Sequence, residues 1–308
     1  MSHLVVGVDG GGSKTQVIVA DGRGKEIATL TGAPSAIRPG DALHSAEVIG
    51  ALVRDALAVA DRGEERPKML TVGVAGAGRE KERKSLLRAL SGEGIADEVQ
   101  VVTDAEIAME DAFGDGPGIL LISGTGSVAF GRGPTGTFIR CGGWGPMCGD
   151  EGSGAWIGRR ALSVITASHD GREPDTRLVG AVLTALQLDE VDDLVTWAAS
   201  ATPKDLAALG VPVMTLAAER DLRANSICTL AAEELVLHVR TLARQLFVDE
   251  RAALPVALAG GMLHRGSFLR RLVEHRLKTA VPGSHLHGEE VVAARGAVKL
   301  ARKALAGV

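Results

Sequence analysis

Short apolar runs alternate with glycine-rich turns through the first third of the chain. The runs have the length and composition of β-strands, and with the turns they predict a meander of hairpins. The predicted strands here are 4–9, 15–20, 25–30, 70–75 and 99–103. Apolar positions that recur at every third or fourth residue predict helices between the later strands. These predicted helices are 42–60, 80–90 and 105–112.

The second half of the chain begins with the same succession of strand, glycine turn and strand, about 115 residues later. Its predicted strands are 118–122, 128–131, 137–141 and 255–259. A long helical region is predicted over 153–247, with breaks near 170–174, 203 and 211–212, followed by helices at 268–277 and 291–306. This duplication predicts an α/β protein of two related lobes with a cleft between them.

The composition favours a folded soluble protein and argues against a nucleic-acid-binding or membrane protein. Of the 308 residues, 45% are hydrophobic and 23% are charged, which is typical of a folded soluble chain. The net charge of −4 and the 3% of aromatic residues argue against a nucleic-acid partner, which would favour a basic surface or a base-stacking platform. No apolar run reaches the roughly 18 residues of a membrane span, and the N-terminal residues lack a signal-peptide pattern. We therefore expect a cytoplasmic protein with no membrane partner.

Glycine is unusually frequent, at 40 of 308 residues, and it gathers at strand ends. The first cluster, 9–15, fits neither the Walker A loop nor the dinucleotide fingerprint, because a strand follows it and Thr15 replaces the last glycine. A tight hairpin of glycines can nevertheless bring backbone N–H groups together in an anion-binding concavity. The phosphate-binding residues predicted here are Gly10, Gly11, Gly12, Ser13, Lys14 and Thr15. The alternative is an ordinary hairpin turn.

Two further glycine turns follow strands. The turn 123–127 alternates hydroxyl residues with glycine, and the turn 259–262 lies between a strand and a helix, where a flat ring could approach the backbone. Three such turns at strand ends favour nucleotide binding over coincidence. The nucleotide contacts expected from the later turns are Gly124, Thr125, Gly126, Ser127, Gly260 and Gly261.

Two aspartates stand at strand ends. Asp9 precedes the first glycine turn, a position that suits Mg²⁺, which binds carboxylate and phosphate oxygens. Asp104 follows the strand 99–103 and could take a proton from an attacking hydroxyl. The same residues also form a capping-box sequence, with Thr103 as N-cap and Glu106 at N3. From the residues alone, both interpretations stay open.

The stretch 141–153 combines clustered glycines with Trp144 and the acids Asp150 and Glu151. A flat apolar ring beside carboxylates that accept hydrogen bonds from hydroxyls suits a sugar. The alternative is a long loop in which Asp150 or Ser153 caps the following helix.

Six motifs occur in order along nearly the whole chain. They are GVDGGGSKT (7–15), TDA (103–105), ISGTGS (122–127), CGGWG (141–145), GDEGS (149–153) and AGGM (259–262). Together they resemble the N-acetylglucosamine kinase branch of the BadF/BadG/BcrA/BcrD ATPase family, within the actin-like, hexokinase-like superfamily. The resemblance implies two ribonuclease-H-like lobes, with ATP and an amino sugar in the cleft between them. It further implies phosphorylation of a sugar hydroxyl, at carbon 6.

The resemblance also implies roles for individual residues. The catalytic aspartate falls on Asp104, and the ATP contacts include Ser13, Thr125 and Ala207. The implied sugar contacts are Gly143, Trp144, Gly145 and Asp150. The family's C-terminal helix packs on the first lobe, which gives lobes of 1–115 joined by 291–308, and of 116–290.

One position departs from the family's pattern. Where its N-acetylglucosamine enzymes carry a sugar-binding Asn, this chain has Ala36, with Ser35 and Arg38 as polar neighbours. Loss of a bidentate amide opens the choice of amino sugar to N-acetylmuramic acid or glucosamine besides N-acetylglucosamine. Arg38 would suit a sugar with an acidic substituent.

Three hypotheses of function follow. The first is a kinase that uses Mg-ATP, with Asp9 on the metal and Asp104 ionised at an ordinary pKa of about 3.9. The second is an ATPase activator of an acyl-CoA dehydratase or reductase, which holds an iron–sulfur cluster through cysteine thiolates. The three cysteines are Cys141, Cys148 and Cys228, an odd number without a CxxC pair, which argues against that cluster, a disulfide framework and a zinc site. The third is a non-enzymatic sugar sensor. Whether the protein forms a homodimer stays open.

Overall fold

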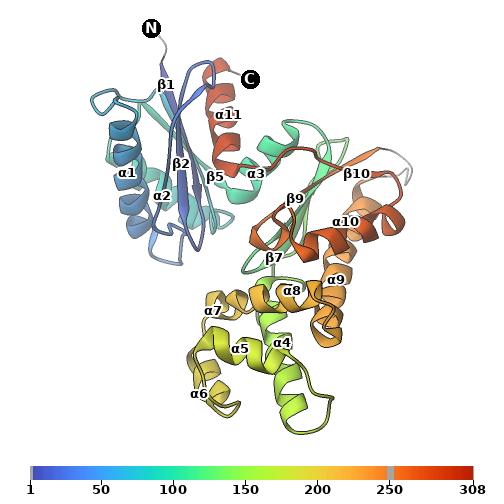
Figure 1. Cartoon of the computed structure of the whole chain (residues 1–308). Coiled ribbons are helices and arrows are strands. Elements are labelled where there is room, and N and C mark those ends of the chain that lie inside the picture. Colours follow the sequence, from blue (N-terminus) through green and yellow to red (C-terminus); the bar gives the residue numbers. More distant parts are fainter. Residues whose placement is uncertain (1–2, 248–252, 308) are drawn as a thin grey trace. The chain divides into compact units, whose positions relative to one another are not determined.

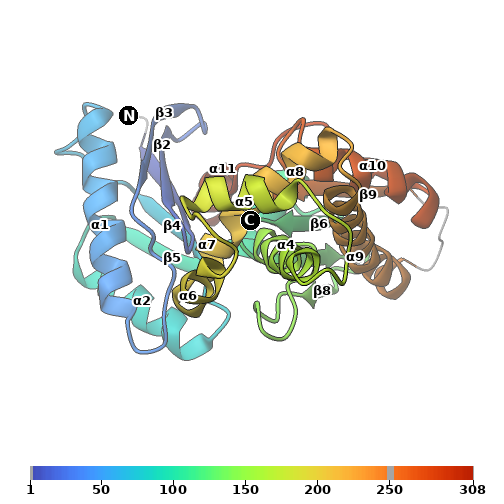
Figure 2. The ribbon, with the colours of Figure 1, turned by 60° about the horizontal axis from the view of Figure 1, so that its bottom comes forward.

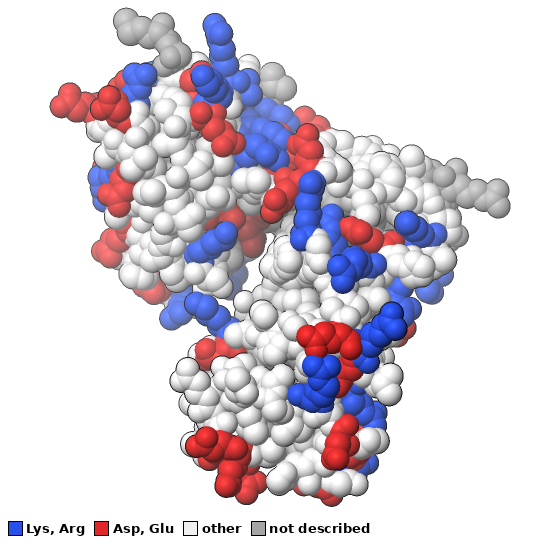
Figure 3. All heavy atoms as spheres, viewed as in Figure 1, with Lys and Arg blue, Asp and Glu red and all other residues white. Residues whose placement is uncertain are grey.

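The computed structural model describes residues 3–247 and 253–307. The chain divides into two compact units, Met1–Asp115 with Val291–Val308, and Gly116–Glu290. Positions 1, 2 and 308 of the predicted first lobe lie outside the described residues. Within the described ranges, every helix is too short or too polar to cross a bilayer. On the face drawn in Figure 3, basic side chains are interspersed with acidic ones.

Unit 1, the first of these, is built on a five-stranded sheet of order β3-β2-β1-β4-β5 (Figure 1). The first three strands form an antiparallel meander, and β4 and β5 continue it in parallel with β1. The strands are β1 (Leu4–Gly10), β2 (Thr15–Asp21), β3 (Glu26–Gly32), β4 (Met69–Val74) and β5 (Glu98–Thr103). The helices are α1 (Ala42–Val59), α2 (Glu80–Gly92), α3 (Asp104–Phe113) and α11 (Ala293–Ala306).

Both faces of this sheet are covered. Val6 and Val8 of β1 pack in the core beneath α1 and α2, whereas Val5 packs against Ala294 and Val298 of α11. Successive side chains of a strand point to opposite faces, so burial on both sides requires an apolar residue at nearly every position. This explains the uninterrupted apolar run at the start of the chain.

Unit 2 repeats this topology, with the order β8-β7-β6-β9-β10. Its strands are β6 (Gly118–Ser123), β7 (Ser127–Arg132), β8 (Phe138–Gly142), β9 (Leu254–Ala259) and β10 (Ser284–Leu286). Its helices are α4 (Gly154–His169), α5 (Leu178–Leu186), α6 (Asp193–Ser200), α7 (Pro203–Ala208), α8 (Gly210–Ala218), α9 (Leu222–Leu246) and α10 (Phe268–Ala280), with a short 3₁₀ turn, η1 (Gly261–Leu263). Figure 2 shows α4, α5, α6 and α7 grouped together within this unit.

The predicted elements agree with the structure except in four places. The break predicted near 211–212 lies at Leu209, between α7 and α8, because Pro212 is in the first turn of α8, where a residue needs no backbone N–H for helical hydrogen bonding. Two breaks were not predicted, at 187–192 between α5 and α6 and at 219–221 between α8 and α9. The three-residue strand β10 was also missed, since so short an apolar segment carries no periodicity.

The helix α11 approaches both β1 and α3 at backbone distance. A Cβ atom on Gly7 would lie 2.4 Å from the carbonyl oxygen of Ala294, and one on Gly296 would lie 1.8 Å from the carbonyl oxygen of Ile107. Neither carbonyl oxygen can move aside, because each belongs to the backbone of a helix. Glycine at both positions therefore fixes how closely α11 packs.

A buried carboxylate reinforces this packing. Asp111 of α3 accepts the backbone N–H of Val292 at 2.7 Å and ion-pairs with Arg295 at 2.7 Å and Lys299 at 2.9 Å. Burial alone would raise the pKa of Asp111, but the hydrogen bonds from Arg295, Lys299 and Val292 outweigh burial and hold the pKa below its usual value. Asp111 therefore stays ionised and ties α11 to α3.

We expect Gly296→Ala to destabilise the protein by about 2–3 kcal/mol, because the new methyl group overpacks the contact with α3. The matched control is Gly180→Ala in α5, where a Cβ meets no atom within 4 Å. That change should leave stability equal or raise it by up to about 1 kcal/mol. Urea unfolding followed by circular dichroism measures both, and equal midpoints for the two variants would contradict the close packing of α11.

Candidate active site

Asp9 and Asp104 meet at one edge of the sheet of unit 1. Because β1, β4 and β5 are parallel, their C-terminal ends lie along the same edge. Asp9 is the second-last residue of β1, and Asp104 begins α3 directly after β5. The two carboxylates are close enough for the charge on Asp104 to affect the pKa of Asp9. Ligands of open α/β sheets bind at this kind of edge.

The predicted capping box at the start of α3 is confirmed. The Thr103 hydroxyl accepts the N–H of Glu106 at 3.2 Å, and the Glu106 carboxylate accepts the N–H of Thr103 at 2.7 Å. Asp104 takes no part in this exchange; one of its oxygens accepts the N–H of Ala105 at 3.0 Å. Thr103 and Glu106 form the cap, so the side chain of Asp104 is not needed for capping and can serve in ligand binding.

Both aspartates are half-buried, which changes the ionisation expected of them. Burial, and next the charge of Asp104, raise the pKa of Asp9 to about 6, although Lys14 acts in the opposite direction. Burial also raises the pKa of Asp104, against hydrogen bonds from backbone N–H groups. The expectation of an ordinary pKa for Asp104 is thus wrong, because it assumed a carboxylate in water.

The first glycine turn is exposed at its tip and tightly packed at its base. Gly12, Ser13 and Lys14 are exposed, and a Cβ on Gly12 would meet no atom within 4 Å. At the base, a Cβ on Gly10 would lie 2.6 Å from the hydroxyl oxygen of Ser35. The tip therefore leaves bare backbone, a hydroxyl and an ammonium group open to an anion, as predicted for phosphate.

The segment after β3 folds back onto this turn. The carbonyl oxygen of Gly11 accepts the N–H groups of Ser35 and Ala36, each at 3.2 Å. The hydroxyl oxygens of Thr15 and Ser35 lie 2.8 Å apart, and both side chains are buried. Because they are buried, Thr15 and Ser35 are well placed to position this segment. Their direct contacts with phosphate and sugar stay predictions. The sequence gives no local sign of this contact, since the two hydroxyls are 20 residues apart.

A hollow of about 490 Å³ opens beside the segment. The residues that line it are Gly12, Pro34, Ala36, Arg38, Asp41 and His44. Position 36, where the family's Asn is absent, thus shares a hollow with the tip of the first glycine turn. Arg38 is exposed there and places a permanent positive charge in the lining.

In unit 2, the second and third glycine turns lie against each other because they follow the adjacent parallel strands β6 and β9. The N–H of Gly124 donates to the carbonyl oxygen of Gly126 at 2.9 Å, which closes the second turn. Gly260 has φ +92°, and a Cβ there would lie 2.3 Å from the carbonyl oxygen of Ser123. Only glycine allows this approach.

Ala207 of α7 lies close to the second turn. The N–H of Gly154, at the start of α4, donates to the carbonyl oxygen of Gly124 at 2.8 Å. A Cβ on Gly154 would lie 2.9 Å from the Cβ of Ala207. The structure thus brings together three of the predicted nucleotide-contacting elements of unit 2, and contact with a nucleotide stays a prediction.

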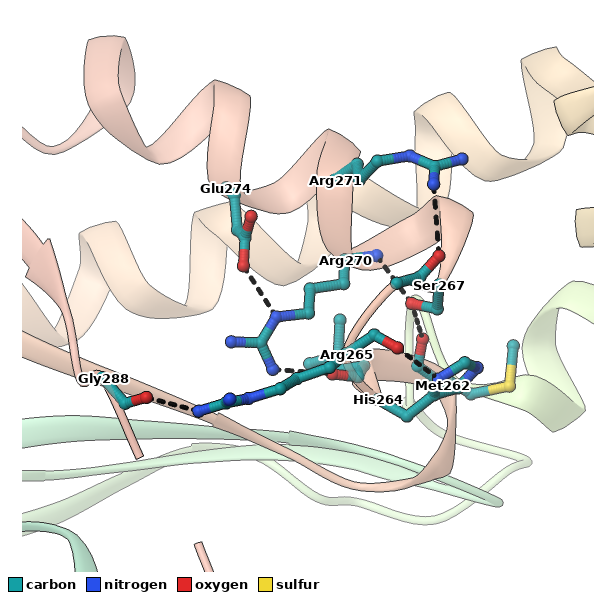
Figure 4. Close-up of polar contacts among 10 residues, drawn as sticks. Met262, His264, Arg265, Ser267, Arg270, Arg271, Glu274 and Gly288 are labelled. Atoms are coloured by element: carbon teal, nitrogen blue, oxygen red, sulfur yellow. Dashed lines mark hydrogen bonds and ion pairs between the residues drawn. The ribbon is translucent and has the colours of Figure 1, made fainter. Parts of the chain in front are cut away.

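Side chains of the α10 region fix the third turn, as Figure 4 shows. Ser267 caps α10 by accepting the N–H of Arg270 at 3.0 Å, and its hydroxyl donates to the carbonyl oxygen of Met262 at 2.8 Å. The Arg270 guanidinium donates to the carbonyl oxygen of Leu263 at 3.0 Å. Gly261 faces open space, so a ring could lie against the backbone at this point.

The glycine-rich loop between β8 and α4 has the left-handed backbone that favours glycine. The residues with positive φ are Gly142, Gly143, Gly145, Gly152 and the non-glycine Asp150. Trp144 is 69% exposed, and the guanidinium of Arg140 lies 4.7 Å from the centroid of its ring. An exposed indole suits the face of a sugar. Ser153 is the cap of α4, through the N–H of Trp156 at 3.1 Å, so Asp150 is not the cap.

Ser127 holds this loop to the second turn. Its hydroxyl donates to the carbonyl oxygen of Glu151 at 2.7 Å, and its N–H hydrogen-bonds the carboxylate of Asp150. These contacts give Ser127 a structural role, and its contact with a nucleotide stays a prediction. Thr125, which is half-buried, remains the hydroxyl side chain available at this turn.

Comparison with known proteins covers almost the whole chain. The sequence pattern of the BadF/BadG/BcrA/BcrD ATPase family matches residues 6–301. The chain belongs to this family. An N-acetylmuramic acid/N-acetylglucosamine kinase of Clostridium acetobutylicum is 31% identical over 300 residues, covering 97% of this chain and 98% of the relative. An N-acetyl-D-glucosamine kinase of Dictyostelium discoideum is 28% identical over 313 residues, covering 97% and 98%.

Solved structures agree with this assignment. A Chromobacterium violaceum protein, described as a candidate N-acetylglucosamine kinase, superposes with a TM-score of 0.83 at 27% identity, covering 97% of this chain and 99% of its own. A ROK family glucokinase from Streptomyces griseus, at 17% identity, covers 97% and 99% with a TM-score of 0.61, and shows likeness of fold alone. The predicted two-lobed α/β fold and the predicted membership of the BadF/BadG/BcrA/BcrD ATPase family are both confirmed.

The raised pKa of Asp9 can be tested through the pH dependence of the protein's stability. A raised pKa means that the folded state holds the proton more tightly than the unfolded state. The contribution of Asp9 to stability is therefore greatest below about pH 4 and is lost as the pH rises through about 6. Without nucleotide or divalent cations, Asp9→Asn should be more stable than the parent protein at pH 8 by up to about 3 kcal/mol, and the difference should shrink at pH 5.

Urea unfolding at pH 5 and pH 8 measures this difference. Asp55→Asn, which changes an exposed carboxylate on α1, serves as the matched control and should show no such dependence on pH. An Asp9→Asn protein that is no more stable than its parent at pH 8 would contradict the burial of a charged Asp9.

Proposed function

We propose that this chain is an ATP-dependent kinase that phosphorylates a hydroxyl of an amino sugar, at carbon 6. The observation that carries the proposal is the half-buried carboxylate of Asp104, which follows a strand at the sheet edge that also holds Asp9 and takes no part in the capping box. The membership of an ATPase family and the kinase relatives matched over 97% of the chain support it. A small-molecule sugar is the substrate class that these relatives imply.

In this proposal Asp104 orients the attacking hydroxyl and accepts its proton. The bond from the hydroxyl oxygen to the γ-phosphorus forms as the bond from the γ-phosphorus to the β,γ-bridging oxygen breaks, and ADP leaves. Phosphoryl transfer depends on positioning and on neutralising charge, more than on covalent chemistry by the protein. The exposed backbone, hydroxyl and ammonium groups at the tip of the first turn would neutralise phosphate charge. The raised pKa of Asp104 makes it a stronger base than an exposed aspartate, provided that it is ionised.

Mg²⁺ fits the residues present. Asp9 is a half-buried carboxylate whose pKa is raised by desolvation and by the charge of Asp104, and it adjoins the turn proposed to hold phosphate. Mg²⁺ takes few protein carboxylates and fills its remaining positions with water and phosphate oxygens. Asp9 would hold the ion, directly or through water, and the ion would supply charge neutralisation for ATP.

The decisive experiment measures ADP release with Mg-ATP against a panel of N-acetylglucosamine, N-acetylmuramic acid, glucosamine, N-acetylmannosamine and glucose. We expect strong stimulation by at least one amino sugar. Steady ATP hydrolysis that is indifferent to every sugar would instead favour the activator hypothesis. That hypothesis has weaker support, since the matching activator structure shares 12% identity and shows fold alone.

Asp104→Asn tests the assignment of the base. It should lower kcat by at least about 100-fold, because the amide cannot accept the proton, while the Kd of an ATP analogue stays within about threefold. The matched control is Glu98→Gln, an exposed acid at the opposite end of β5, which should keep normal turnover. Near-normal turnover by Asp104→Asn would remove Asp104 from the catalytic role.

Arg38 tests which sugar the hollow accepts. A guanidinium beside position 36 would favour a sugar that carries a carboxylate, such as N-acetylmuramic acid. We expect Arg38→Ala to raise the KM for N-acetylmuramic acid by about tenfold, and that for N-acetylglucosamine by less than twofold. An equal change in KM for both sugars would show that Arg38 does not recognise the acidic substituent.

A further inference from the structure

Asp150 contacts two elements to which different ligands have been assigned. Its side chain is buried, and its Oδ1 atom accepts the N–H of Gly145, in the loop proposed to bind the sugar, at 3.1 Å. The same carboxylate receives the N–H of Ser127, at the end of the second glycine turn. A Cβ on Gly126 would lie 2.6 Å from its Oδ2 atom, so the carboxylate is seated directly on the turn.

The backbone of Asp150 is unusual as well. It has φ +60°, a region that few non-glycine residues adopt and that costs about 1 kcal/mol or more. Its neighbours are also attached to the turn. The Ser127 hydroxyl donates to the carbonyl oxygen of Glu151, and the Ser123 hydroxyl donates to that of Gly152 at 2.9 Å. The loop therefore cannot shift at residues 150–152 without moving both ends of the turn.

We propose that Asp150 is a positioning residue that couples sugar binding at residues 143–145 to nucleotide binding at the second glycine turn. The inference rests on the proposed kinase function. A sugar that orders the Gly145 backbone would fix the carboxylate through Oδ1, and the carboxylate would in turn fix the backbone of Gly126 and Ser127 in the turn. Each ligand would then bind more tightly in the presence of the other, by the same factor in both directions. The role differs from the direct sugar contact that the family resemblance implies.

Calorimetry of the full-length protein tests the coupling. The Kd of a non-hydrolysable ATP analogue with Mg²⁺ is measured with and without the amino sugar of highest turnover in the panel above. The Kd of that sugar is measured with and without the analogue. In the parent protein we expect each ligand to lower the Kd of the other at least about fivefold. In Asp150→Ala this factor should fall below twofold, while the Kd of the analogue alone changes less than threefold.

Two further variants, a second disruption of the same contact and a control, complete the test. Gly126→Ala displaces the carboxylate from the turn without changing Asp150, and it should also reduce the factor below twofold. Asp221→Ala is the control, because it removes a carboxylate that accepts one backbone N–H, at the cap of α9, and the factor should be unchanged. This control measures how far a general loss of stability changes the coupling factor.

The outcomes are distinct. A variant at position 150 that binds sugar weakly but keeps the parent coupling factor would make Asp150 a plain sugar contact and overturn the inference. A parent protein that binds both ligands without coupling would overturn it too. A parent protein that binds neither ligand would instead count against the proposed kinase function.

Discussion

Keeping the two carboxylates Asp9 and Asp104 out of water is the constraint around which the edge of the first sheet is arranged. Parallel strands bring them together, and like charges in a partly dehydrated place oppose ionisation. Backbone N–H groups at the start of α3 and the ammonium of Lys14 offset only part of this effect. This edge therefore concentrates negative charge that a cation carried by a nucleotide would relieve.

The two units share more than the order of their strands. In each, the chain that leaves the third strand of the meander turns back and is pinned to the glycine turn between the first two strands. In unit 1 the pinned segment is 35–36, held by Gly11, and in unit 2 it is 150–152, held by Ser123 and Ser127. The duplication therefore extends to the loops, and each glycine turn is rigid because a later segment supports it.

Local signals made much of the fold predictable. The apolar run through Val5 and Val6 and the capping box at 103–106 are each contained within a few residues, and both were found from the sequence. Contacts between distant residues were not predictable in this way. The pairing of Thr15 with Ser35 depends on how the chain returns, and the pKa of Asp104 depends on burial that only the folded sheet produces. The candidate nucleotide and sugar residues were recognisable as motifs, but which of them face outward was not.

The close contact of α11 with β1 has a consequence for the order in which the protein is made. Val5, Ile18, Ala20 and Met69 form an apolar face that residues 294–301 cover. A ribosome completes the whole of Gly116–Glu290 before it reaches those residues, so the second unit can fold first, against the usual order from the N-terminus. Until then the earliest strands present an uncovered apolar face, and exposed apolar surface of this kind promotes aggregation during translation.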